Sequence, residues 1–375
     1  MSSIFPCSQT GGRIFQFIRI LLVYWVAMLG CPGLIYSMTF QETPDSPGVI
    51  QPLFISEEPV ELTLISDFRT LMQQKSQEEP QYQPAELVYK TSSGKEERIS
   101  LKIRPRGFSR RKYDICSFPP ILLNFKKKSV VGTLFEGQDR LKLVTYCKNL
   151  DINEAFVLKE FLVYKTYNIL TDYSYQVRLA QITYKDINDK QKPITRYGFF
   201  IESDKNLPAR MNAVLFKDKL NNHDRCDHAS LDLFTIFQYM IGNTDWWILN
   251  YHNATVLQVP SKLPVPVPYD FDFSGALNTP YASPDEKLPI KTVRERMFRG
   301  YCRPAGTYER IIQIFKEKKD AIYAMYRKFE LLEERDIETT LKYFDSFYEI
   351  LDDPKKVIRT FYDNCEISHK HVHIQ

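Results

Sequence analysis

The sequence predicts an α+β protein with two lobes, a β-rich N-terminal lobe and a mostly helical C-terminal lobe. Strand-like segments dominate up to residue 203, and amphipathic helical segments dominate after it. The chain of 375 residues is 43% hydrophobic and 26% charged, an ordinary globular composition that can supply a core of this size. We therefore expect a β-rich lobe with one helix over residues 59–203 and a helical lobe over residues 204–375.

The expected strands show polar–apolar alternation or short apolar runs. They are VELTLIS (60–66), AELVYK (85–90), RISLKIRPRG (98–107), PPILLNF (119–125), LKLVTYC (141–147), YQVRLAQITYKD (175–186) and RYGFFIES (196–203). The helix within this region is predicted over residues 152–170, with Asp151 and Glu154 as its N-cap pair. Further helices are predicted over residues 231–243, 307–332, 334–351 and 354–364.

The N-terminus has the pattern of a targeting segment. Arg13 and Arg19 lie before or at the start of an apolar stretch that carries no further charge until Glu42. This pattern predicts a signal peptide or membrane anchor over residues 1–37, followed by a linker over residues 38–58. Lipidation at Cys31 is a third option. All three predict export to the periplasm or cell envelope, and an anchor would add membrane association.

Cysteine content and charge add weaker constraints. Five cysteines lie outside the targeting segment, and a Cys116–Cys147 disulfide fits an oxidising compartment. Buried free thiols are the alternative. The net charge of +4 includes basic runs at residues 110–112 and 126–128. Such runs are usually solvated, and without a recognition motif we expect no nucleic-acid polymer as partner.

The candidate site begins with IGNTDWWILNYHN, where Asn250 lies five residues after Asp245. Phosphoryl transfer uses a carboxylate to accept the proton of the attacking hydroxyl and an amide oxygen to hold a metal ion. An apolar strand then leads to Asp270 and Asp272 in YDFDFSG, whose hard oxygen atoms suit Mg²⁺. The pattern predicts Asp245 as catalytic base and Asn250, Asp270 and Asp272 as metal ligands.

A structural interpretation of these residues competes with the catalytic one. The same spacing of aspartate and asparagine arises by chance in long chains. Asp245 would then cap a turn, and Asp270 and Asp272 would line a solvated bend. The combination of a preceding buried helix with a following strand and acidic pair favours chemistry.

Nucleotide-binding residues are predicted upstream. Lys142, on a late strand, is expected to bind phosphates and to pair with Glu160 on the next helix, although an ordinary strand-edge lysine is the alternative. A GxGxxG loop is absent, so Arg104 and Arg106, together with Arg110 or Arg111, would cradle the phosphates. The motifs HExxH, GxSxG and the P-loop are also absent, which disfavours the metalloprotease, α/β-hydrolase and P-loop classes.

Five segments in this order resemble the CotH-type spore-coat protein kinase family, especially its exported bacterial relatives. They are RPRGFSRR, CSFPPILLNF, NEAFVLKEFLVYKTYNIL, IGNTDWWILNYHN and VPYDFDFSG, within residues 55–300. The resemblance implies an atypical protein-kinase-like fold that uses ATP with Mg²⁺ or Mn²⁺ to phosphorylate protein Ser or Thr. It assigns Asp245 as catalytic and Asn250 with Asp270 or Asp272 as metal ligands.

Export raises a competing hypothesis, because ATP is scarce outside the cytoplasm. The chain would then be a catalytically silent, kinase-like binding or structural protein of the bacterial cell envelope. The protein substrate is not specified by the sequence under either hypothesis.

Overall fold

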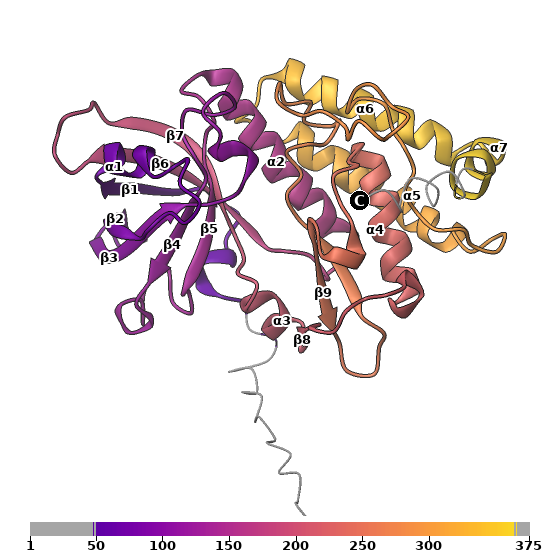
Figure 1. The fold of residues 1–375 in the computed structure, drawn as a ribbon, viewed down its shortest axis with the longest axis horizontal. Coiled ribbons are helices and arrows are strands. Elements are labelled where there is room, and N and C mark those ends of the chain that lie inside the picture. Colours follow the sequence, from indigo (N-terminus) through magenta and orange to yellow (C-terminus); the bar gives the residue numbers. More distant parts are fainter. Residues whose placement is uncertain (1–47, 49, 364, 366–375) are drawn as a thin grey trace, which may run out of the picture. The chain divides into compact units, whose positions relative to one another are not determined.

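The first seven strands close into a barrel. The computed structural model describes residues 48, 50–363 and 365. The strand order is β1-β2-β3-β4-β5-β7-β6, and the ring closes where β1 pairs in parallel with β6 (Figure 1). The strands are β1 Val60–Ser66, β2 Gln83–Lys90, β3 Glu96–Pro105, β4 Ile121–Phe125, β5 Arg140–Val144, β6 Val177–Asp186 and β7 Ile194–Ile201.

The predicted two-lobed, protein-kinase-like fold is wrong, because the strands form a closed barrel that a helical region accompanies. Alternation identified the strands and their faces, but it carries no information about which distant strands pair. Leu62 lies opposite Ile182 in the closing pair, and both side chains are buried inside the barrel. The interior is filled with aliphatic and aromatic side chains, among them Leu87, Ile103 and Phe200.

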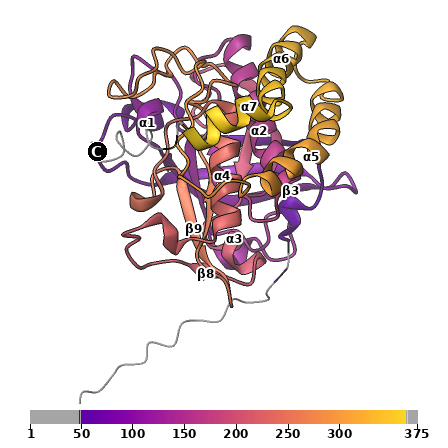
Figure 2. The same cartoon turned by 90° about the vertical axis from the view of Figure 1, so that its right-hand side faces the viewer.

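After β7 the chain forms the helical region, in which α4 contacts α5, α6 and β10 (Figures 1 and 2). The α-helices are α1 Phe68–Gln73, α2 Asp151–Leu170, α3 Asn206–Arg210, α4 His228–Ile241, α5 Glu309–Arg327, α6 Glu334–Leu351 and α7 Pro354–Val357. A three-stranded antiparallel sheet has the order β10-β9-β8, with β8 Val214–Leu215, β9 Ala254–Gln258 and β10 Val265–Pro268. Short 3₁₀-helices span Pro52–Phe54, Ser109–Arg111, Lys127–Ser129, His223–Arg225 and Ile248–Asn250, and a π-helix spans Ile358–Asp363.

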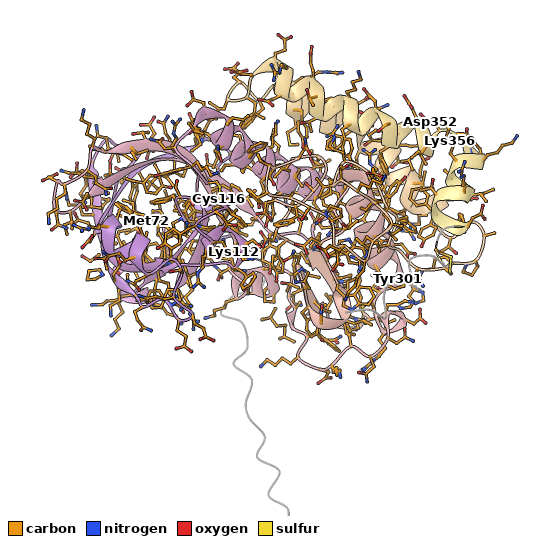
Figure 3. All side chains as sticks on the ribbon, turned by 45° about the horizontal axis from the view of Figure 1, so that its top comes forward. Met72, Lys112, Cys116, Tyr301, Asp352 and Lys356 are labelled. Carbon is orange, nitrogen blue, oxygen red and sulfur yellow. A yellow bond between two sulfur atoms is a disulfide. The ribbon has the colours of Figure 1, made fainter. Side chains whose placement is uncertain are left out.

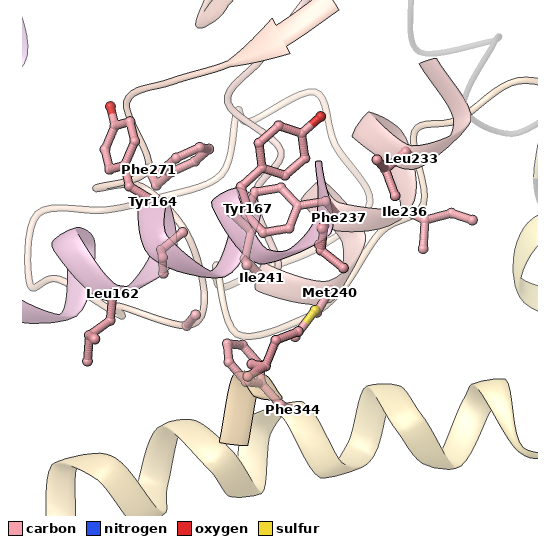
Figure 4. Packing of buried hydrophobic residues seen from close by; sticks show 14 of the residues in the cluster. Leu162, Tyr164, Tyr167, Leu233, Ile236, Phe237, Met240, Ile241, Phe271 and Phe344 are labelled. Carbon is pink, nitrogen blue, oxygen red and sulfur yellow. The ribbon is translucent and has the colours of Figure 1, made fainter. Parts of the chain in front are cut away.

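Helix α2 joins the barrel to the helical region. It contacts β7 on one side and α5 on another. In Figure 4, Tyr164 of α2 lies beside Phe271, and Tyr167 of α2 lies beside Phe237 of α4. The ring centroids of Tyr164 and Phe271 are 4.6 Å apart. Because α2 is buried on nearly all sides, a polar residue on it is held firmly in place.

The predicted helix at residues 152–170 is confirmed, but its capping differs. Asp151 is the first helical residue, and Leu150 takes the N-cap position without a capping side chain. The carboxylates of Asp151 and Glu154 bind Arg196 of β7 instead, at 2.7 and 3.3 Å. The acidic first turn therefore ties the helix to the barrel.

Two disulfides are present in the part of the chain that the structure describes. The predicted Cys116–Cys147 bond is confirmed, and a second bond joins Cys302 and Cys365. Cys226 is buried as a free thiol. No helix in the described part of the chain is long and apolar enough to cross a membrane. The targeting segment predicted over residues 1–37 lies outside the described residues.

Candidate functional site

The loop that carries Asp245 starts from a tight helix end. Gly242 caps α4 in the left-handed conformation with φ 65°. A Cβ atom there would collide with the hydroxyl of Tyr343, so glycine is needed for both backbone and space. Asn243 then accepts a hydrogen bond from the backbone N–H of Asp245 at 3.0 Å. Helix end and turn together set the direction of Asp245.

The Asp245 carboxylate is held by two residues that sequence reasoning missed. Its Oδ1 lies 2.7 Å from Nε2 of His252, and its Oδ2 accepts from Nδ2 of Asn253 at 3.0 Å. The hydrogen bond to Asp245 raises the pKa of His252. The side chain of Asp245 is still 40% exposed, so a reacting group can approach it. His252 and Asn253 orient the carboxylate.

Asn253, rather than Asn250, is the asparagine next to Asp245. Asn250 is exposed, and its side-chain oxygen accepts the backbone N–H of His252 within the turn. Asn253 is buried, and its carbonyl accepts from the backbone of Tyr269 at 3.1 Å. The structure thus does not bring Asn250 to the acidic residues. Asn253 lies directly before β9, and the pairing of β9 with β10 brings it next to Tyr269, where the acidic segment starts. Its position before a strand was therefore the sequence signal that could have identified it.

Asp270 and Asp272 lie where the chain leaves β10. Asp270 has φ 63°, and its N–H donates to the Tyr164 hydroxyl at 2.9 Å. Asp272 is buried and accepts from the Tyr281 hydroxyl at 3.1 Å. Burial and the nearby charge of Asp270 raise the pKa of Asp272 to about 7. The two carboxylates predicted as metal ligands are therefore in electrostatic contact.

Glu160 of α2 completes a cluster of three acidic side chains. It is buried, and burial together with the charges of Asp272 and Asp270 raises its pKa well above the ordinary value. We call Glu160, Asp270 and Asp272 the acidic cluster. Like charges that lie close together in a buried site disfavour each other's ionised forms. Binding of a cation would offset this repulsion, so the cluster favours cation binding.

Lys142 does not pair with Glu160. Its Nζ lies 2.8 Å from Oδ1 of Asp204, which follows β7 and was not identified from the sequence. The Tyr175 hydroxyl also donates to Asp204, at 2.8 Å. Burial lowers the pKa of Lys142, and the charges of Asp204 and, to a lesser extent, Asp270 oppose this shift. Lys142 thus borders the acidic cluster but is balanced by a different carboxylate.

The arginines predicted as a phosphate cradle divide into two groups. Arg104 stacks over the Tyr82 ring at 4.9 Å and donates to the carbonyl of Pro80, so it belongs to the barrel surface. Arg106 exerts an electrostatic effect on Glu160 and on Lys142, which places it near the cluster. Arg110 is buried and interacts electrostatically with the acidic cluster.

A cleft adjoins the other side of Asp245. It has a volume of about 450 Å³, and its lining is Thr244, Asp245, Trp246, His252, Phe273 and residues 283–287. Arg299 lies beneath this wall, where its guanidinium donates to the backbone carbonyls of Thr244 and Trp246. Asp245 therefore stands between an open cleft and the neighbourhood of a buried acidic cluster.

Whether the site can hold a divalent metal ion depends on which groups besides the protein side chains supply ligands. Within the described residues, no group of three or more His, Cys, Asp or Glu side chains is arranged to hold a metal ion by itself. Mg²⁺ in nucleotide sites needs only one or two protein carboxylates, because phosphate oxygens and water complete its shell. Asp270 and Asp272 fit that kind of shared site, because the charge of Asp270 contributes to the raised pKa of the buried Asp272.

Comparisons with known proteins give no assignment: no family model matches the chain, and no curated protein matches it. The resemblance to the CotH-type family therefore stays a prediction.

Proposed function

We propose that the chain is a metal-dependent phosphotransferase that moves the γ-phosphate of ATP to the hydroxyl of a protein Ser or Thr. The observation that carries the proposal is the position of Asp245, an oriented and accessible carboxylate between an open cleft and the acidic cluster. An acceptor hydroxyl would enter from the cleft, and a nucleotide with its metal would lie on the side of the cluster.

The chain's residues have distinct tasks in this reaction. Asp245 accepts the proton of the acceptor hydroxyl as its oxygen bonds to the γ-phosphorus and the bond to the bridging oxygen of ADP breaks. His252 and Asn253 orient the Asp245 carboxylate through hydrogen bonds. Lys142 and Arg106, which interact electrostatically with each other, would balance phosphate charge.

Asp270, Asp272 and Asn253 are the residues that would hold Mg²⁺ or Mn²⁺. When bound, the metal ion offsets the negative charge of the phosphates. The raised pKa of Asp272 supports this assignment, because a cation would replace the proton that the apo cluster favours.

The test is transfer of labelled γ-phosphate from ATP in the presence of Mn²⁺ to Ser- and Thr-containing peptides and to the chain itself. We expect transfer by the wild type and a loss of at least about 100-fold in Asp245→Asn, the range that a general base contributes. Asp189→Asn, a change at an exposed position on the β6–β7 hairpin, should leave transfer unchanged. Equal transfer by Asp245→Asn would overturn the proposal.

The second candidate is a silent nucleotide-binding protein of the cell envelope. The 2.8 Å ion pair between Lys142 and Asp204 favours it, because this pair occupies the lysine that would otherwise meet phosphates. That candidate predicts that the wild type binds Mn²⁺ and ATP but transfers no phosphate to any acceptor. The two disulfides support export to an oxidising compartment under either candidate.

A further inference from the structure

Arg110 has an unmet hydrogen-bonding capacity inside the protein. Its side chain is buried, with 8% exposure, and one terminal nitrogen donates to the carbonyl of Thr145. Its Nε, however, has no hydrogen-bond partner among the residues that the structure describes. A buried donor without a partner is costly, so such a group usually meets a ligand, an ion or water.

The surroundings of Arg110 indicate what that ligand is. Arg110 interacts electrostatically with Glu160, Asp272 and Asp270, yet no ion pair within 4.0 Å joins it to any carboxylate of the described residues. The guanidinium therefore lies near the acidic cluster without forming an ion pair with it. A guanidinium opposite metal-binding carboxylates matches an anion that binds metal and arginine together, and phosphate oxygens do both.

We infer that Arg110 is a phosphate-binding residue of this site and that the Cys116–Cys147 disulfide positions it. The inference rests on the proposed function, which it extends to the redox state of the chain. Arg110 lies on the loop between β3 and β4, within the 3₁₀-helix Ser109–Arg111. Apart from this 3₁₀-helix, the described loop has no regular secondary structure. The position of Arg110 therefore depends on the contacts that attach the loop to neighbouring segments.

The strongest anchor is the segment between β5 and α2. Cys147 forms the disulfide with Cys116, and its carbonyl accepts from the backbone of Ser117 and Phe118 at 2.9 and 3.0 Å. Thr145 donates to the carbonyl of Pro119 at 2.9 Å and accepts from Arg110. The same segment connects Lys142 on β5 with Glu160 on α2. The disulfide therefore ties the Arg110 loop to the stretch that carries two other site residues.

A second anchor joins the loop to the end of α1. Lys75 is buried and donates to the carbonyl of Cys116, and Arg111 donates to the carbonyl of Lys75 at 2.8 Å. The Tyr113 hydroxyl donates to the carbonyl of Met72 at 2.9 Å. Figure 3 labels Met72, Lys112 and Cys116 in the barrel part of the molecule. This anchor holds the outer part of the loop, so breaking the disulfide loosens the loop without releasing it.

Both sulfur-bearing residues are buried, with exposures of 0% for Cys116 and 5% for Cys147. We therefore expect the disulfide to form once, as the protein folds, and not to act as a readily reversible switch. Its formation removes two electrons and two protons from the two thiols, which a disulfide-bearing oxidant accepts. A dithiol reductant runs the reverse reaction and becomes a disulfide itself. Phosphate binding should accordingly become strong only after the chain meets an oxidising compartment.

Binding of inorganic tripolyphosphate with Mn²⁺, measured by calorimetry, tests the inference without requiring catalysis. We expect Arg110→Ala to raise Kd at least about tenfold, and Arg110→Lys to restore part of the loss. Cys116→Ser with Cys147→Ser should weaken binding in the same direction and speed hydrogen exchange in residues 106–116. Cys302→Ser with Cys365→Ser, which removes the other disulfide, is the matched control and should bind like the wild type.

Three results would overturn the inference: wild-type affinity in Arg110→Ala, equal weakening in both disulfide variants, or no tripolyphosphate binding by the wild type. If the Cys116/Cys147 variant does not fold, Arg110→Ala and Arg110→Lys still decide the role of the arginine. Dithiothreitol treatment of the folded Cys302→Ser/Cys365→Ser variant then tests the Cys116–Cys147 disulfide alone. Tight, Arg110-dependent binding without phosphate transfer would leave this inference standing and refute the proposed function.

Discussion

At the scale of single residues, the site depends on buried carboxylates whose charges oppose each other. Glu160 and Asp272 both have raised pKa values, first because they are buried and then because acidic neighbours surround them. Such a cluster reduces the stability of the metal-free protein wherever it is ionised. Functional sites commonly carry this kind of strain.

Asp272 gives the metal-free protein a specific pH dependence. Its pKa is about 7 when folded, above the value of 3.8 for an unperturbed aspartate. The folded state therefore binds this proton more tightly, and stability from this group is present at low pH and falls as pH rises from about 4 to 7. In thermal unfolding of the metal-free protein, Asp272→Asn should flatten this part of the pH profile. An unchanged profile would contradict the assignment.

Tyr164 provides a second prediction at this scale. Its hydroxyl accepts the N–H of Asp270, which has the strained φ of 63°. Tyr164→Phe keeps the ring and its packing on Phe271 but removes this acceptor. We expect a loss of about 1–3 kcal/mol in the free energy of unfolding and weaker Mn²⁺ binding. Tyr167→Phe, on the same helix and in the same core, is the control that should leave Mn²⁺ binding unchanged.

At the scale of elements, the end of α4 and the β9–β10 pair bring the site together. The helix end directs Asp245, and the strand pair carries Asn253 to the residues before Asp270. The β9–β10 register, with Ala254 opposite Pro268, leaves both polar segments at the same end of the pair. Secondary structure thus converts two distant stretches of chain into one site.

Gly242→Ala tests the helix end. The left-handed φ of 65° costs about 1–2 kcal/mol for an L-residue, and the new methyl group must also displace the Tyr343 hydroxyl. We expect the free energy of unfolding to fall by at least that amount, measured by urea denaturation, together with a loss of phosphate transfer. Gly94→Ala, at a turn with φ 81° and open space, should cost stability but not transfer.

The sequence was informative where the signal is local and failed where it is not. Alternation located the barrel strands, and the apolar spacing of residues 152–170 located α2. The D-x₄-N spacing led to Asn250, because a fixed spacing cannot reveal how the Trp247–His252 bridge folds the loop back. No local sequence pattern marked Asp204 as a site residue, because its ion pair with Lys142 arises only when β5 pairs with β7.

At the scale of the whole molecule, barrel closure and disulfides hold the structure together. The parallel pairing of β1 with β6 joins strands from opposite ends of the first half of the chain. Such non-local pairing leaves no local pattern, which is why the sequence predicted a β-rich lobe but not the closure of its strands into a barrel. Arg196 of β7, bound to the first turn of α2, links the barrel to the helical region.

The Cys302–Cys365 disulfide should contribute stability without contributing to the site. It joins residues separated by 63 positions, so its removal frees a long loop in the unfolded chain. We expect Cys302→Ser with Cys365→Ser to lower the free energy of unfolding by about 2–4 kcal/mol. Denaturant titration measures this loss. A variant as stable as the oxidised wild type would show that the bond does not constrain the unfolded chain.

The most direct test of the central claim is calorimetric titration of Mn²⁺ and ATP into the wild type and Asp272→Asn, with Asp189→Asn as control. The account predicts binding by the wild type and the control, and at least about tenfold weaker binding by Asp272→Asn, because the variant removes a carboxylate from the acidic cluster. Equal affinities for all three proteins would contradict the claim that the acidic cluster is a metal–nucleotide site.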